Sequence, residues 1–153
     1  DPVSVKVPAG ITDGQKLKVK GKGQPSPNGG PTGDLVVSIK VKPHPVFVRD
    51  GDNVRVVVPV TFAEAVLGAT IQVPVLGEAP VKLKVAPGTP NGRTLRVKGK
   101  GVQGAKQGDL LATIEIAVPA HVNDKAQELL KAFEAEIPEE DPRADLISKA
   151  GLL

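Results

Sequence analysis

The stretch Val81–Leu111, VKLKVAPGTPNGRTLRVKGKGVQGAKQGDLL, decides the fold because the sequence contains it twice. Residues 3–23, VSVKVPAGITDGQKLKVKGKG, match its first part at a shift of 78 positions, which places Gly10 on Gly88. After a loop that is three residues shorter in the second copy, Gly33-Asp34-Leu35 matches Gly108-Asp109-Leu110. An internal repeat of this kind sets the architecture, so we expect two equivalent units.

Each copy is typical of at least three short strands that share one apolar face. In the first copy, apolar residues alternate with polar ones over 3–7, 16–20 and 35–41, and 81–85, 94–98 and 110–116 repeat the pattern. Alternation with this period indicates half-buried strands. Asp13-Gly14 and Asn91-Gly92 separate the first two runs, and such dipeptides favour hairpin turns.

The second copy has a longer lead-in than the first. The residues before it predict a strand over 54–58 that ends at Pro59, a short helix over 61–68 and a strand over 71–76. A turn over 77–80 then leads into the repeat. Nothing comparable precedes Val3, so we expect a fragment of a longer protein, without the front half of its first repeat.

The short helix carries its own start and stop signals. Thr61 and Glu64 have the spacing of a capping box. Gly68 fits the left-handed position after the last turn. Ala63, Val66 and Leu67 are expected to lie over the sheet.

Composition limits the function classes. Aromatic residues make up 2% of the 153 residues, so a core must consist of Val, Leu and Ile. Cysteine is absent, which excludes a disulfide framework or a thiolate metal site within these residues. No apolar run approaches the length of a membrane span, and no signal peptide is visible.

The net charge is +3, and many lysines occupy alternate strand positions, as Lys16, Lys18 and Lys20 do. A solvated sheet face protected from aggregation explains this pattern best. Nucleic-acid binding is a minor alternative because Tyr and Trp are absent and no Phe lies among these lysines.

Residues 42–53, KPHPVFVRDGDN, connect the two copies. Prolines keep this connector extended, and Asp50-Gly51-Asp52 predicts a turn. Phe47 is an isolated aromatic residue here. It is either a wedge that packs one domain on the other or a wall of a binding groove.

The period changes after Pro119. Asn123 is a plausible N-cap, and apolar residues at helical spacing follow until Pro138. This stripe either folds back on its own sheet or packs on a second copy of the chain. A last short helix is expected over 143–150. The apolar residues predicted for dimerisation are Leu129, Leu130, Phe133 and Ile137.

Catalytic and metal chemistry finds no support in these residues. Gly21-Lys22-Gly23 and its second copy lack the spacing of a phosphate-binding loop, and a turn that needs glycine explains them better. His44 and His121 stand alone, without a metal-ligand pattern. Asp34 and Asp109 are interpreted as structural caps of a repeated turn. We therefore expect no enzyme and no metal site.

Taken together, the motifs resemble the C-terminal substrate-binding region of DnaJ-type J-domain co-chaperones. The matching runs are VKVPAGITDGQKLKVKGKG, GDLVVSIKVKPHPVFVRDGDNV, PVTFAEAVLGATIQVPVLG, GRTLRVKGKGV and GDLLATIEIAVP, in this order. They cover residues 3 to about 133, and the His-Pro-x-Phe-x-Arg-Asp-Gly-Asp run is highly specific.

The resemblance implies a mainly β protein with tandem β-sandwich-like C-terminal domains, the first truncated, a short helix in the second and a C-terminal dimerisation helix. The expected divisions are residues 1–48, 49–120 and 121–153. Full-length relatives also carry a J-domain and often a Cys-rich zinc module. Neither lies in this chain, so we expect no cofactor here and no stimulation of a DnaK-type ATPase by this fragment.

The implied function is capture of unfolded or misfolded polypeptide in shallow apolar grooves, for delivery to a DnaK-type chaperone by the full-length protein. The resemblance also implies a cytoplasmic homodimer without membrane association. Strand addition is the expected binding mode. By position the client-binding candidates are Val3 and Phe47 in the first groove, and Val56, Val58, Ile71, Val73 and Val81 in the second. For each valine, a plain core role is the alternative.

Overall fold

The computed structural model describes residues 2–104 and 106–151. Its contacts divide the chain into two compact units, Asp1–Ala117 and Val118–Leu153. The chain is mainly β, as the sequence predicts. The expected division at residue 48 remains a prediction.

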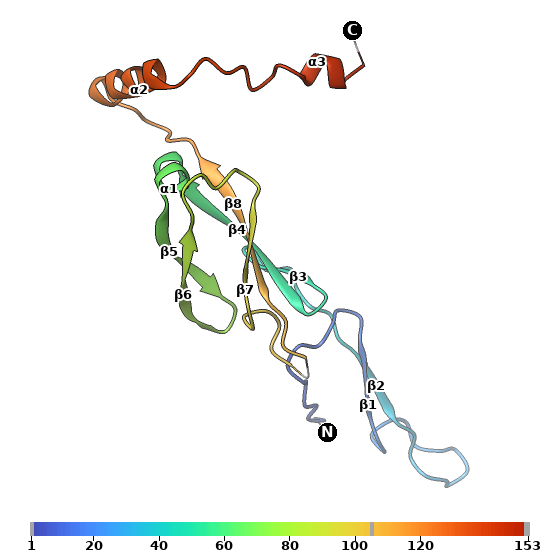
Figure 1. Cartoon of the computed structure of the whole chain (residues 1–153). Helices are drawn as coiled ribbons and strands as arrows, with labels where there is room; N and C mark the ends of the chain where they lie inside the picture. The colour runs from blue at the N-terminus through green and yellow to red at the C-terminus, as the bar shows by residue number, and fades with distance from the viewer. Residues whose placement is uncertain (1, 105, 152–153) are drawn as a thin grey trace. The chain divides into compact units, whose positions relative to one another are not determined.

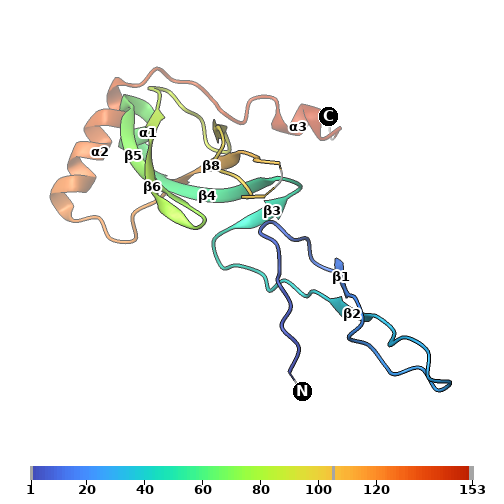
Figure 2. The ribbon, with the colours of Figure 1, turned by 90° about the horizontal axis from the view of Figure 1, so that it is seen from below.

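The first unit begins with a short antiparallel hairpin of β1 (Lys16–Val19) and β2 (Leu35–Ser38) (Figure 1). A mixed sheet follows, with strand order β3-β4-β8-β7. In it, β4 and β8 are parallel, and β3 and β7 pair antiparallel at the two edges. A second hairpin consists of β5 and β6, and α1 links β4 to β5 (Figure 2). The bounds are β3 Val48–Asp50, β4 Asn53–Thr61, α1 Phe62–Leu67, β5 Ala69–Val75, β6 Glu78–Val85, β7 Thr94–Val97 and β8 Leu110–Ala117.

The core lies between the mixed sheet and the β5–β6 hairpin. Every second residue of β4 from Val54 to Val60 is buried, and Val73 on β5 and Leu110 on β8 are fully buried. These side chains form one cluster with partly buried residues of the hairpin. Two layers joined by an apolar interior are the sandwich-like arrangement predicted for the second repeat.

The repeat is confirmed down to its strand register. Leu17 pairs with Val37 in the first copy, and the matching residues Leu95 and Ala112 pair in the second. The turns agree as well, because the Gly14 amide donates to Ile39 as the Gly92 amide does to Ile114. The hairpins β1–β2 and β7–β8 therefore have equivalent geometry. The hairpin predicted between the first two runs of each copy is wrong, because Asn91-Gly92 joins β6 to β7, which do not pair, and residues 3–7 form no strand.

Asp34 and Asp109 close equivalent loops, as predicted. The Gly21 amide donates to Asp34 Oδ1 at 3.0 Å, and the Gly99 amide donates to Asp109 Oδ1 at 2.8 Å. These backbone bonds lower the pKa of each carboxyl group from its usual value, and bonds from Lys18 and Arg96 respectively lower it further. The aspartates are structural caps.

The strand predicted over residues 3–7 does not form. The equivalent residues of the second copy lie in β6, where Val81 pairs with Val73 of β5. Within the described residues, the first copy has no counterpart of β5 to supply the hydrogen bonds. Its alternating pattern alone is therefore not sufficient for a strand.

Two predicted element ends in the second copy are wrong. Pro59 does not end β4, which continues to Thr61 while Pro59 pairs with Glu115. There β3 no longer pairs with β4, and proline is tolerated on such an edge. The turn before β6 is also shorter than predicted, because it consists of Leu76 and Gly77 alone.

The capping box of α1 is confirmed, since Thr61 Oγ1 accepts from the Glu64 amide and the Glu64 carboxylate accepts from the Thr61 amide. The predicted buried side is wrong. Ala65 is the buried residue of α1, whereas Leu67 is 74% exposed and Ala63 and Val66 are also exposed. Ala65 belongs to the core cluster, and the amides of Gly88 and Thr89 in the loop after β6 donate to its carbonyl.

Gly68 also departs from its predicted conformation. Its φ of 83° is positive but its ψ is 152°, which is not left-handed helical. A Cβ atom here would lie 2.9 Å from the Pro87 ring. Close approach of the loop after β6 therefore adds to the requirement for glycine.

The second unit contains α2 (Asp124–Glu136) and α3 (Leu146–Lys149). Asn123 caps α2 as predicted, because its side chain accepts from the Ala126 amide. The last helix is shorter than the predicted 143–150.

Candidate functional site

A cavity of about 960 Å³ lies where the first repeat meets the second within the first unit. The first repeat contributes the loop 9–13 and the start of the connector, and the second contributes β3, the tip of the β5–β6 hairpin and the loop 101–103. The apolar side chains that line it are Ala9, Ile11, Val41, Pro43, Phe47, Val48, Val54, Leu76 and Val102.

Arg49 holds the two repeats together at this cavity. Its Nη1 donates to the carbonyl oxygens of Gly10 at 2.6 Å and Ile11 at 2.8 Å. Its Nε donates to the carbonyl of Gly51 at 2.8 Å, so one guanidinium group joins the first-repeat loop to the turn after β3. A rigid planar donor set suits this task.

The backbone approaches closely at the same joint. Gly10 has a φ of 80°, and a Cβ there would lie 2.8 Å from the Gln103 carbonyl oxygen. Its repeat equivalent Gly88 has open space around the same position. The tight fit at Gly10 therefore belongs to the contact between repeats and not to the turn itself.

His44 shapes the connector beside Phe47. Its Nδ1 accepts from the amides of Val46 at 3.0 Å and Phe47 at 3.2 Å. The two rings lie 5.0 Å apart in a tilted arrangement. Phe47 is half-buried, packs against the core of the second repeat and lines the cavity. It therefore packs as the wedge interpretation expects and also lines a cavity, whereas its role as the wall of a binding groove stays a prediction.

The end of the connector motif, residues 50–53, makes contacts within the second repeat. Asp50 pairs with Arg55 at 2.7 Å across the β3–β4 hairpin. The Asp52 carbonyl accepts from the Val102 amide, and Asn53 Oδ1 accepts from the Asp109 amide, both at 2.9 Å. The connector motif therefore builds the joint on which the cavity depends.

Comparison with known proteins agrees with this architecture. A family model described as the DnaJ C terminal domain matches residues 1–119. The chain belongs to the DnaJ C-terminal domain family.

Three relatives illustrate the similarity. "Chaperone protein DnaJ 1" of Streptomyces coelicolor is 50% identical over 150 residues, which is 97% of this chain and 38% of the relative. The protein of the same name from Streptomyces avermitilis is 51% identical over 150 residues, with the same coverage. "Chaperone protein DnaJ" of Burkholderia thailandensis is 44% identical over 152 residues, 97% of this chain and 40% of the relative. The chain spans about two fifths of the relatives it matches.

The structure separates the predicted client-binding residues of this DnaJ C-terminal domain. Phe47 lines the cavity, whereas Val3 is 41% exposed and lies outside it. Val56, Val58 and Val73 are core side chains, at most 6% exposed, in agreement with their plain core interpretation. Ile71 and Val81 are partly buried and pack against that core.

Most cavity residues escaped the sequence analysis. Ile11, Val41, Val48, Leu76 and Val102 come from five separate segments, and no local pattern joins them. The one sequence feature that could have pointed to the cavity is the connector motif within residues 42–53. A highly specific run that carries no catalytic chemistry indicates a structural joint.

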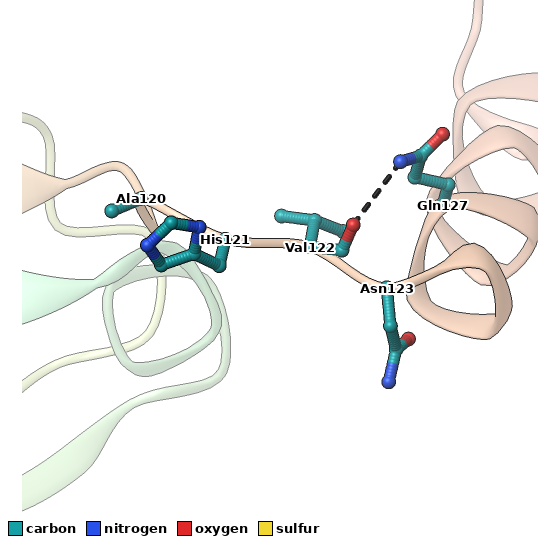
Figure 3. Close-up of a pocket in the computed structure, with 5 residues that line it drawn as sticks. All are labelled: Ala120, His121, Val122, Asn123 and Gln127. Atoms are coloured by element: carbon teal, nitrogen blue, oxygen red, sulfur yellow. Dashed lines mark hydrogen bonds between the residues drawn. The ribbon is translucent and has the colours of Figure 1, made fainter.

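A second, shallow pocket lies in the unit 118–153 (Figure 3). It is lined by Ala120, His121, Val122, Asn123 and Gln127, and Gln127 Nε2 donates to the Val122 carbonyl at 3.1 Å. The polar side chains of Asn123 and Gln127 form hydrogen bonds that stabilise the first turn of α2. Within residues 2–104 and 106–151, no three His, Cys, Asp or Glu residues are grouped as a metal site.

The residues predicted for dimerisation are solvent-exposed on and after α2, which buries none of its residues. The exposed fractions are 59% for Leu129, 57% for Leu130, 41% for Phe133 and 49% for Ile137. Among the described residues, no helix has the length and apolar character needed to cross a bilayer.

Proposed function

We propose that this DnaJ C-terminal domain binds extended apolar segments of unfolded polypeptide. The observation that carries the proposal is the open, mostly apolar cavity beside Phe47. Its volume of about 960 Å³ accommodates more than one large side chain. In a longer protein like the DnaJ relatives, the captured segment would pass to a DnaK-type ATPase chaperone.

The expected affinity is modest. Burial of one Leu- or Phe-sized client side chain contributes roughly 1.5–3 kcal/mol. Two such anchors, less the cost of ordering the client, give a dissociation constant no lower than about micromolar. Weak binding suits a protein that must release its clients.

Binding to a reduced, unfolded protein tests the proposal. Val48→Asp places a charge on the apolar wall, where Val48 is 61% exposed and its replacement leaves the core intact. We expect roughly tenfold weaker binding, because a carboxylate there disfavours an apolar occupant. Val57→Asp is the matched control, since Val57 is 55% exposed on β4 and does not line the cavity. Equal effects of both variants would refute the assignment.

We also propose a homodimer through α2. A second tethered domain raises the effective client concentration to roughly millimolar and so strengthens weak capture. The support is the exposed row of Leu129, Leu130 and Ile137. Replacing Leu129, Leu130 and Phe133 with Ala should yield a monomer that suppresses aggregation less well. A variant that still sediments as a dimer would contradict this.

Nucleic-acid binding remains the alternative. Several basic side chains are paired with acids, as Lys18 is with Asp34 and Lys100 is with Glu78. Oligonucleotide affinity that falls steeply between two salt concentrations, without affinity for unfolded protein, would favour this alternative.

A further inference from the structure

Two of the four asparagines in the chain, Asn28 and Asn91, are followed by glycine. Asparagine is chemically labile, and glycine has no side chain to keep its backbone nitrogen away from the preceding side chain. In an Asn-Gly pair that nitrogen can therefore attack the amide carbon of the asparagine. Both pairs lie in turns and both asparagines are exposed, so access to water does not distinguish them.

Hydrogen bonds hold both reacting groups of the Asn91-Gly92 pair. Asn91 Oδ1 accepts from the Ile116 amide at 2.9 Å, and the Gly92 amide donates to the Ile114 carbonyl at 2.7 Å. Both partners belong to β8, a central strand of the mixed sheet. Attack by the Gly92 nitrogen would have to break the second bond and turn the side chain away from the first.

The Asn28-Gly29 pair lacks this restraint. It lies in the loop between β1 and β2 (Figure 1), and the Asn28 side chain has no hydrogen-bond partner within residues 2–104 and 106–151. The Gly29 amide donates to the Ser26 carbonyl at 3.3 Å, a longer and weaker bond than the one that holds Gly92. A Cβ at Gly29 would meet no atom within 4 Å, so the pair can rearrange without displacing a neighbour.

We propose that Asn28 is a site of spontaneous deamidation, at which the folded chain acquires an aspartate or an isoaspartate. The Gly29 nitrogen forms a bond to Asn28 Cγ and gives up its proton, and the side-chain nitrogen leaves with that proton as ammonia. Water then opens the cyclic imide by breaking one of its two carbon–nitrogen bonds. One opening gives aspartate and the other gives isoaspartate, and water is the sole co-reactant.

The modification changes the charge of its loop. The charged residues between β1 and β2 are Lys20, Lys22 and Asp34, so one new carboxylate cancels the net positive charge of this loop. Isoaspartate also lengthens the main chain by one carbon. The residue does not line the cavity beside Phe47, so the site is separate from the proposed client site.

The test is incubation of the whole chain at mildly alkaline pH, followed by trypsin digestion, chromatography and mass spectrometry. Trypsin separates the two pairs, because residues 23–40 and 85–93 form different peptides. We expect Asn28 to convert at least roughly tenfold faster than Asn91, because two hydrogen bonds must open before attack at Asn91. In urea the two rates should become similar, since the hydrogen bonds are then lost.

Asn28→Gln is the matched control. Its side chain is one carbon longer, so the attack would have to close a six-membered ring and is slower. We expect this variant to release ammonia at a clearly lower rate than the unaltered chain. Release at the unaltered rate would place the reaction at another residue and overturn the proposal.

The remaining outcomes are equally decisive. Equal conversion of Asn28 and Asn91 in the folded chain overturns the proposal, as does an Asn28 that stays intact while Asn91 converts. A tenfold difference that persists in urea also overturns it, because the difference would then come from the neighbouring residues and not from the hydrogen bonds of the fold.

Discussion

Replacing Arg49 with Ala should detach the first-repeat loop from the second repeat and open the cavity wall. The side chain donates three hydrogen bonds, to Gly10, Ile11 and Gly51. Because Arg49 is exposed to solvent, each bond is assigned about 0.5–1 kcal/mol, the lower part of the usual range. The bond to Gly51 lies within the second repeat, so the two bonds to Gly10 and Ile11 carry the docking: together they contribute about 1–2 kcal/mol, which corresponds to a roughly 5- to 30-fold shift in the docking equilibrium.

Two measurements check this expectation. The chain has no cysteine, so spin labels on cysteines introduced at Lys20 and Lys82 report the distance between repeats without background labelling. We expect a broader distance distribution in Arg49→Ala, and weaker binding of an environment-sensitive apolar dye to the cavity. Arg49→Lys should be intermediate, because an ammonium group lacks the planar donor set.

Arg55→Ala is the matched control. Arg55 is a neighbouring exposed arginine whose side chain pairs with Asp50 of the same β3–β4 hairpin, within the second repeat. It should leave the distance distribution and dye binding unchanged. The reasoning fails if Arg49→Ala behaves like the unaltered chain, or if Arg55→Ala produces the same loss.

Equivalent positions of the two copies provide further tests. Leu110→Ala should lower the free energy of unfolding by about 2–5 kcal/mol in urea melts, and the half-buried Leu35→Ala by clearly less; equal losses would contradict the burial argument. Gly108→Ala should prevent stable folding, because its Cβ would overlap a facing backbone carbonyl, whereas Gly33→Ala meets only an ordinary contact at 3.6 Å and should melt normally. Asp109→Asn should destabilise at pH 7. Because the folded-state pKa of Asp109 is lowered, its stabilisation is present above the unfolded pKa of about 4 and disappears as pH falls through the folded value; a pH-independent difference between variant and unaltered chain would be inconsistent with this.

Sequence reasoning succeeded where the decisive interactions are local. The capping box at Thr61 and Glu64 and the N-cap Asn123 act within three residues, so their geometry follows from spacing alone. The hairpin expected across Asp13-Gly14 and Asn91-Gly92 was wrong, because β6 pairs with β5 and β7 pairs with β8. The turns at these dipeptides are nevertheless local and equivalent in the two copies. For the same reason the match between copies predicted the shared topology.

Sequence reasoning failed where the structure of a segment depends on a partner that is distant in the chain. Residues 3–7 and 81–85 have the same alternation, yet the second run alone forms a strand, because β5 lies beside it. The predicted buried side of α1 was wrong because Ala65 is the helix residue that packs in the core, against side chains from strands elsewhere in the chain.

The sequence by itself determined the family, the repeat, the turns and the helix caps, since each depends on residues that are neighbours in the chain. Only the tertiary structure decided which valines are core and that Phe47 lines a cavity. Burial and strand pairing depend on what covers a residue from elsewhere in the chain, and a period-two pattern carries no information about that cover.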